Sequence, residues 1–143
     1  MINIMYKKIL IVEDEDELRK NIARLVKILG FIPDEAPNGE EAYTKIVENE
    51  YDLVISDIKM PVMDGYNLLL KVRNNEMKKH IQFIFLTSTI ELNDIRKAMI
   101  LGADDYVTKP FDNQELAKTI RARLERAGEL SEFYRNKFQS VIK

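Results

Sequence analysis

The chain has 143 residues, of which 45% are hydrophobic and 32% are charged, so a single domain with a packed core is expected. Lys and Arg number 22 against 24 Asp and Glu, and a net charge of −2 argues against a protein that coats nucleic acid or a membrane surface. Cysteine is absent and histidine occurs once, which excludes disulfides, thiolate nucleophiles and metal centres rich in His or Cys. Reactive groups must therefore be carboxylates, amines or hydroxyls, and a bound metal should prefer oxygen, as Mg²⁺ does.

Short apolar runs recur along the chain and are typical of parallel strands covered on both faces. In chain order, the predicted strands are Ile9–Val12, Ile32–Ala36, Leu53–Ile55, Phe83–Leu86 and Tyr106–Thr108. The apolar pattern is weaker in the second and fifth of these predicted strands. No apolar run is long enough to span a membrane, and Met1–Tyr6 is too short and mixed for a signal segment, so a cytoplasmic protein is expected.

Between the strands the apolar spacing changes to that of a helix. In chain order, the predicted helices are marked by Leu18 to Leu29, Ala42 to Ile46, Leu68 to Val72, Ile95 to Met99 and Leu116 to Leu124. Gly30 and Gly102 are placed to end the first and fourth helices, and Asp112 with Glu115 is a capping pattern for the fifth. Strict alternation of five strands and five helices predicts a doubly wound α/β sheet.

The domain is expected to cover residues 7–126, with residues 127–143 as a C-terminal helical extension or linker helix. Apolar residues from Leu124 to Val141 follow a spacing of three and four, which favours either a long fifth helix or, weakly, a coiled coil. Basic and acidic residues alternate in this segment, as on a solvated helix face. We therefore expect no direct binding of nucleic acid by this chain.

Chemically active side chains follow four of the predicted strands. Glu13 and Asp14 follow the first strand, Asp57 the third, Thr87 the fourth and Lys109 the fifth. In a doubly wound sheet these strand ends meet at one edge, where ligands bind. Crowded carboxylates repel one another, so the acids need a cation between them. Lys109 supplies one positive charge and Mg²⁺ is the natural source of more.

These residues lie in stretches that together resemble the receiver domain of two-component response regulators: ILIVEDE, YDLVISDIKMPVMDGY, FIFLTS and GADDYVTKPF. The stretches occur in the family's order and spacing and cover roughly Lys7 to Arg126. The resemblance implies a flavodoxin-like three-layer sandwich, with five helices around a five-stranded parallel sheet of order 2-1-3-4-5. It also implies a phosphorylated signalling domain that serves a histidine kinase or phosphotransfer protein. Such a domain catalyses its own phosphorylation and slow dephosphorylation and is not otherwise an enzyme.

The resemblance assigns a role to each residue at the strand ends. Asp57 would be the phosphoacceptor, and Thr87 and Lys109 would hold the phosphoryl group. Asp14, Asp57 and the backbone carbonyl of Lys59 would bind Mg²⁺, and Glu13 would act through a metal-bound water.

The resemblance also implies a switch and an output face. Tyr106 would turn inward when Thr87 shifts, so that the fourth helix, fifth strand and fifth helix form the output face. Lys59 and Thr89 stand where the family tunes the rate of dephosphorylation. Ile100 lies about 140° around its helix from the buried stripe, so it is expected to face outward and to contribute to a phosphorylation-dependent homodimer or a partner contact.

Other function classes fit the sequence less well. A pseudo-receiver would dock partners without being phosphorylated, but the complete set of residues at the strand ends favours a phosphorylated receiver. A dehalogenase-like phosphatase needs an Asp-x-Asp pair, and Lys59 stands where the second acid would be required after Asp57. A flavodoxin-like FMN binder needs a hydroxyl- and glycine-rich loop after the first strand, where this chain is acidic.

Overall fold

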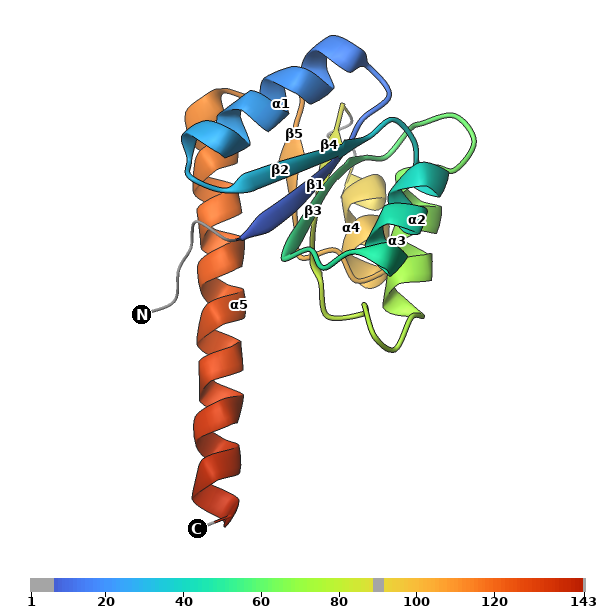
Figure 1. The fold of residues 1–143 in the computed structure, drawn as a ribbon. Coiled ribbons are helices and arrows are strands. Elements are labelled where there is room, and N and C mark those ends of the chain that lie inside the picture. The colour runs from blue at the N-terminus through green and yellow to red at the C-terminus, as the bar shows by residue number, and fades with distance from the viewer. Residues whose placement is uncertain (1–6, 89–91, 143) are drawn as a thin grey trace.

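The computed structural model describes residues 7–88 and 92–142, which form alternating strands and helices (Figure 1). The strands are β1 (Lys8–Val12), β2 (Ile32–Ala36), β3 (Leu53–Asp57), β4 (Gln82–Thr87) and β5 (Asp105–Thr108). The helices are α1 (Asp16–Ile28), α2 (Gly39–Glu48), α3 (Gly65–Arg73), α4 (Leu92–Ile100) and α5 (Asn113–Ile142). The predicted alternation is confirmed. β3 and β4 end later than predicted, because the backbones of Asp57 and Thr87 still pair with neighbouring strands although their side chains are polar.

All neighbouring strands are parallel, and the sheet has the order β2-β1-β3-β4-β5. The expected fold class is therefore confirmed. The chain moves outward from β1 to β2 and then crosses back to β3, so the order reverses between β1 and β3. The pairing register places Val12 opposite Ser56 and Asp57 opposite Leu86. The carboxyl ends of β1, β3 and β4 are thereby level with one another, and side chains that follow them share one edge of the sheet.

Helices cover both faces of the sheet: α1 and α5 lie on one face, and α2, α3 and α4 on the other (Figure 1). Successive side chains of a strand point to opposite faces. In β1, Ile9 and Ile11 pack in the cluster that includes α1 and α5, whereas Leu10 and Val12 pack in the cluster that includes α2 and α3. Each fully buried aliphatic side chain contributes about 1.5–3 kcal/mol to stability, so these two clusters stabilise the packing of the strands that carry the site.

Short polar side chains begin the helices that approach the candidate site. Asp64 accepts a hydrogen bond from the backbone N–H of Asn67 (2.8 Å) at the start of α3. At the start of α5, Asp112 accepts one from the N–H of Glu115 (2.7 Å), which confirms the predicted cap. These bonds satisfy backbone N–H groups that a helix start leaves without a partner inside the helix.

Helix α5 is one continuous helix from Asn113 to Ile142 and extends well beyond the sheet (Figure 1). The spacing seen from Leu124 onward therefore continues α5 and does not mark a separate element. No helix in the described ranges is long and apolar enough to cross a membrane.

Candidate functional site

The site begins with two acids that follow β1. Glu13 is only 1% exposed, whereas Asp14 is exposed. One carboxylate oxygen of Glu13, Oε1, accepts a hydrogen bond from Lys109 Nζ (2.8 Å), and the other, Oε2, accepts one from the backbone N–H of Glu15 (3.1 Å). Both carboxylate oxygens of Glu13 thus bond to groups of the protein, whereas the side chain of Asp14 is accessible to solvent.

Asp57 is the last residue of β3 and is only 9% exposed. Its Oδ1 accepts a hydrogen bond from the N–H of Ile58 (2.8 Å), and its Oδ2 accepts one from Lys109 Nζ (3.1 Å). The start of α3 passes very close to it, because a Cβ placed on Gly65 would lie 2.3 Å from the backbone oxygen of Asp57. Only glycine permits this approach.

Lys109 follows β5 and bridges Glu13 to Asp57 through the two hydrogen bonds given above. Burial alone would lower the pKa of Lys109, but the hydrogen bonds and charges of the two carboxylates outweigh that effect and raise it. Burial raises the pKa of Glu13, and its hydrogen bond to Lys109 limits the rise. Lys109 therefore stays protonated at neutral pH and acts as a fixed positive charge between the acids.

Glu13, Asp14 and Asp57 each present a carboxylate oxygen within 4.8 Å of the others. Three carboxylates at such distances repel one another, and the one ammonium group of Lys109 offsets only part of that charge. Hard oxygen ligands in this number suit Mg²⁺, which is bound by one or two carboxylates and keeps several waters. The donor set therefore fits the predicted Mg²⁺ site, with Asp14 on the accessible side.

A cleft of about 240 Å³ opens beside Asp57. Its lining includes Lys59 after β3 and Thr87 at the end of β4. Thr87 is buried and Lys59 is exposed. The structure thus brings the predicted phosphoryl-holding threonine to the same cleft as Asp57, as its position at a strand end predicted.

The remaining predicted residues lie away from this centre or outside the described residues. Tyr106 on β5 is 36% exposed, so its ring is at the surface. Ile100, at the end of α4, is 77% exposed, as expected from its position on the helix. Thr89 lies outside the described residues.

Arg19 is a buried residue of the site that sequence reasoning missed. From α1 its Nη1 donates to the backbone oxygen of Glu13 (2.8 Å), while Nε donates to Glu35 (3.1 Å) and Nη2 to Asp16 (2.6 Å). It fixes the loop that presents the acid pair. The sequence signal that could have indicated this role is the position of Arg19 itself, a basic residue between Leu18 and Ile22 on the apolar stripe of the helix.

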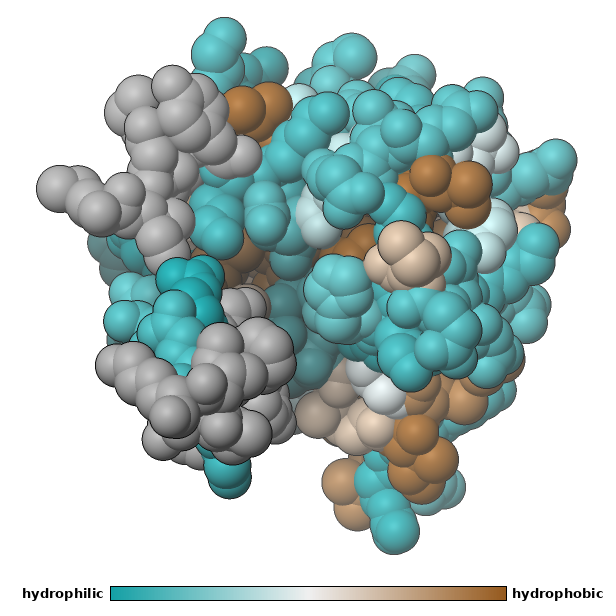
Figure 2. All heavy atoms as spheres, turned by 60° about the horizontal axis from the view of Figure 1, so that its bottom comes forward, coloured by the Kyte–Doolittle hydropathy of each residue, from teal (hydrophilic) through white to brown (hydrophobic). Residues whose placement is uncertain are grey.

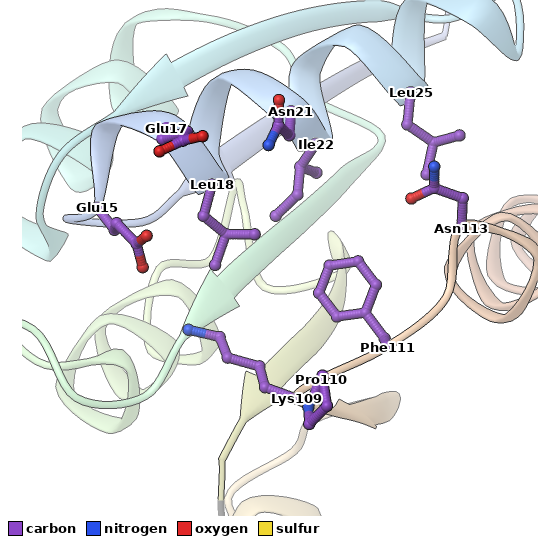
Figure 3. Close-up of a pocket in the computed structure, with 10 residues that line it drawn as sticks. All are labelled: Glu15, Glu17, Leu18, Asn21, Ile22, Leu25, Lys109, Pro110, Phe111 and Asn113. Atoms are coloured by element: carbon purple, nitrogen blue, oxygen red, sulfur yellow. The ribbon is translucent and has the colours of Figure 1, made fainter.

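A second cavity that the sequence did not reveal lies between α1 and the segment that joins β5 to α5 (Figure 3). Its volume is about 490 Å³. Leu18 and Ile22 of α1 point across it toward Phe111, and Lys109 and Pro110 form another part of its wall (Figure 3). Lys109, which bonds to Asp57, is thus also part of the wall of this groove.

The chain matches the family model described as the response regulator receiver domain over residues 9–121. It is 36% identical over 122 residues to the phosphate regulon transcriptional regulatory protein PhoB of Pseudomonas aeruginosa, covering 85% of this chain and 53% of that protein. It is also 36% identical over 129 residues to the transcriptional regulatory protein ResD of Bacillus subtilis, covering 90% and 52% of the two chains. The chain thus spans about half the length of these relatives.

Solved structures agree with this result. A putative response regulator from Chloroflexus aurantiacus has a TM-score of 0.80 and 31% identity, covering 84% of this chain and 98% of that one. The receiver domain of a sensor histidine kinase from Pseudomonas aeruginosa has a TM-score of 0.78 and 27% identity, with the same two coverages, and holds a magnesium ion coordinated in its active-site cleft. On the matched residues, the fold and these likenesses, the chain belongs to the receiver domain family of two-component response regulators.

Proposed function

We propose that this receiver accepts a phosphoryl group on Asp57 from a histidine kinase or phosphotransfer protein, in a reaction that depends on Mg²⁺. The observation that carries the proposal is the setting of the Asp57 carboxylate. It lies at a strand end beside an open cleft, with one oxygen on a backbone N–H and the other on Lys109. A carboxylate held in this way is a positioned nucleophile next to a fixed positive charge.

In the transfer step, a carboxylate oxygen of Asp57 forms a bond to phosphorus while the bond from phosphorus to the donor's imidazole nitrogen breaks. The imidazole leaves with the electron pair and regains a proton. Lys109 and Thr87 stabilise the charge on the phosphoryl oxygens. Asp14, Asp57 and the backbone carbonyl of Lys59 would hold Mg²⁺, and Glu13 would act on the ion through a bound water. The ion would supply further charge neutralisation.

The state of Asp57 would be communicated through Thr87 and Tyr106. β4 and β5 are paired, with Phe85 opposite Tyr106 and Thr87 opposite Thr108. A phosphoryl group that draws Thr87 inward leaves space next to β5. The exposed ring of Tyr106 can then turn into that space, which changes the surface formed by α4, β5 and α5.

The donor protein would dock on the groove between α1 and the start of α5 (Figure 3). Leu18 and Phe111, which are both partly exposed, offer an apolar contact for a helix of the donor, and Lys109 in the wall of the groove also bonds to Asp57. A donor histidine presented beside this groove would lie close to Lys109, the residue that bonds to the Asp57 carboxylate.

The test is the intact mass of the protein after incubation with acetyl phosphate and Mg²⁺. We expect one added phosphoryl group, absent without Mg²⁺ and absent from Asp57→Asn. Asp64→Asn is the matched control, because Asp64 lines the same cleft and Asn still caps a helix. Fluoroberyllate serves as a stable mimic of the phosphoryl group. If the unaltered protein gives no adduct and does not bind fluoroberyllate, the proposal is contradicted and a pseudo-receiver is favoured. Loss of the adduct in both variants would contradict the assignment of Asp57.

A further inference from the structure

The cleft beside Asp57 holds a second lysine that the predicted site does not include. Besides Asp57 and Thr87, the cleft is lined by Tyr66 of α3 and by Asp94 and Lys97 of α4. A helix of the proposed output face thus places a cation, the exposed side chain of Lys97, at the wall of the cavity beside Asp57.

Lys97 has a defined partner in this structure. Its Nζ lies 4.4 Å from the centre of the Tyr66 ring, within the range of a cation–π contact. The ring is itself held in place: it packs edge-on against Phe85 of β4, with centroids 5.6 Å apart, and its hydroxyl donates to the backbone oxygen of Asp94 (3.4 Å). Tyr66 therefore positions the ammonium group of Lys97 at the wall of the cleft.

The charges around the cleft favour movement of Lys97 after phosphorylation. Asp57, Asp64 and Asp94 line it, against Lys59 and Lys97, and Lys109 also bonds to Asp57. A phosphoryl group carries about −1.5 to −2 charges at neutral pH, so it adds negative charge at Asp57. Contact with an aromatic face is weaker than an ion pair with a charged oxygen acceptor in a partly enclosed site.

We propose that Lys97 is a second phosphoryl-binding lysine, which the ring of Tyr66 holds in the unphosphorylated protein and which moves onto the phosphoryl oxygens when Asp57 is modified. The inference rests on the proposed function and adds to it a link between the phosphoryl group and α4. Lys109 approaches from the end of β5, and Lys97 approaches from the helix. Phosphorylation would therefore draw α4 toward the site independently of Thr87 and Tyr106.

The chain offers a matched control for this pair. Lys71 lies over the ring of Tyr43, with Nζ 5.0 Å from the ring centre, and neither residue lines the cleft. Fluoroberyllate with Mg²⁺ serves as the probe, and its binding is followed by the ¹⁹F signal of the bound ion. We expect Lys97→Met to weaken binding about twofold to fivefold, the fold-change that corresponds to an ion pair near a surface. Lys97→Arg should bind as the unaltered protein does, and Lys71→Met should have no effect.

A second readout reports the movement itself. Because Nζ of Lys97 lies over the Tyr66 ring, the ring current should shield the neighbouring ε-CH₂ protons. Their NMR signal should therefore move downfield when fluoroberyllate binds, while the signal of Lys71 stays in place. Equal binding by Lys97→Met and Lys71→Met, or an unmoved Lys97 signal, would overturn the inference while leaving the proposed function intact. If the unaltered protein takes up neither a phosphoryl group nor fluoroberyllate, the proposed function and the inference about Lys97 are both contradicted.

Discussion

Replacing Lys109 with Met removes the cation between the two carboxylates at the centre of the site. Lys109 Nζ lies 2.8 Å from Glu13 Oε1 and 3.1 Å from Asp57 Oδ2. Breaking a buried ion pair by removing one partner costs about 3–5 kcal/mol. Because the side chain of Lys109 is 22% exposed, solvent screens part of the interaction. We therefore expect Lys109→Met to lower the free energy of unfolding by about 2 kcal/mol near neutral pH.

The cost should depend on pH through Glu13. Burial raises the pKa of Glu13 above 4.5 and the bond to Lys109 opposes that rise, so the variant should raise it further. Near neutral pH the variant holds a buried, ionised Glu13 without its partner. As the pH falls through the raised pKa, the folded protein takes up a proton before the unfolded chain does, and stability is recovered. The raised pKa of Lys109 acts only at alkaline pH, where its contribution is lost as the pH rises through the folded value.

Urea unfolding followed by circular dichroism measures this effect at about pH 7 and about pH 5. The four proteins are the unaltered chain, Lys109→Met, Glu13→Gln and the double variant. We expect the cost of Lys109→Met to fall by about half when Glu13 is already neutral, and to shrink at the lower pH. A cost that is the same in both backgrounds and at both pH values would refute the reasoning, because the effect of the lysine would then not depend on the charge of Glu13.

Three further variants test other parts of the structure. Gly65→Ala should lower the free energy of unfolding by about 1–3 kcal/mol and slow phosphorylation, because the added Cβ would lie 2.3 Å from the backbone oxygen of Asp57. Gly128→Ala is the control and should not destabilise the protein, because nothing lies within 4 Å of a Cβ at that position. Equal unfolding midpoints of the two variants would contradict this reasoning. Ile100→Glu should leave phosphorylation intact and weaken association of the phosphorylated protein with itself or a partner, measured by analytical ultracentrifugation and pull-down; unchanged association would remove its contact role. Substitutions at Lys59 and Thr89 should alter the rate of dephosphorylation through access of the attacking water; unchanged loss of the phosphoryl adduct would count against that role.

The contact role of Ile100 needs a functional test, because exposed apolar residues are not confined to one place. On the face of the molecule that Figure 2 shows, apolar atoms form several separate areas within a mostly hydrophilic surface. Exposed apolar side chains also occur away from the proposed output face, as at Ile28 and Met77. Single exposed apolar residues are common on folded proteins, so exposure alone does not identify an interface.

The fold was predictable because its signals are local. Runs such as Ile9–Val12 are apolar on both faces, and the segments between runs have a helical spacing, so alternation and parallel pairing follow from the sequence. The candidate site was predictable for a related reason: strand ends of a parallel sheet share an edge. Glu13, Asp57, Thr87 and Lys109 could therefore be placed together from their positions after the strands.

The sequence by itself thus determined the class of fold, the order of its elements and the edge at which the reactive residues gather. Only the tertiary structure decided which of them touch: Lys109 bridges Glu13 and Asp57, Arg19 holds the backbone of Glu13, and Lys97 lies over Tyr66. The physical reason is that a repeating pattern fixes which face of a helix is buried. How far the helix sits along the sheet, and which long side chains then meet, depends on the packing of the whole core.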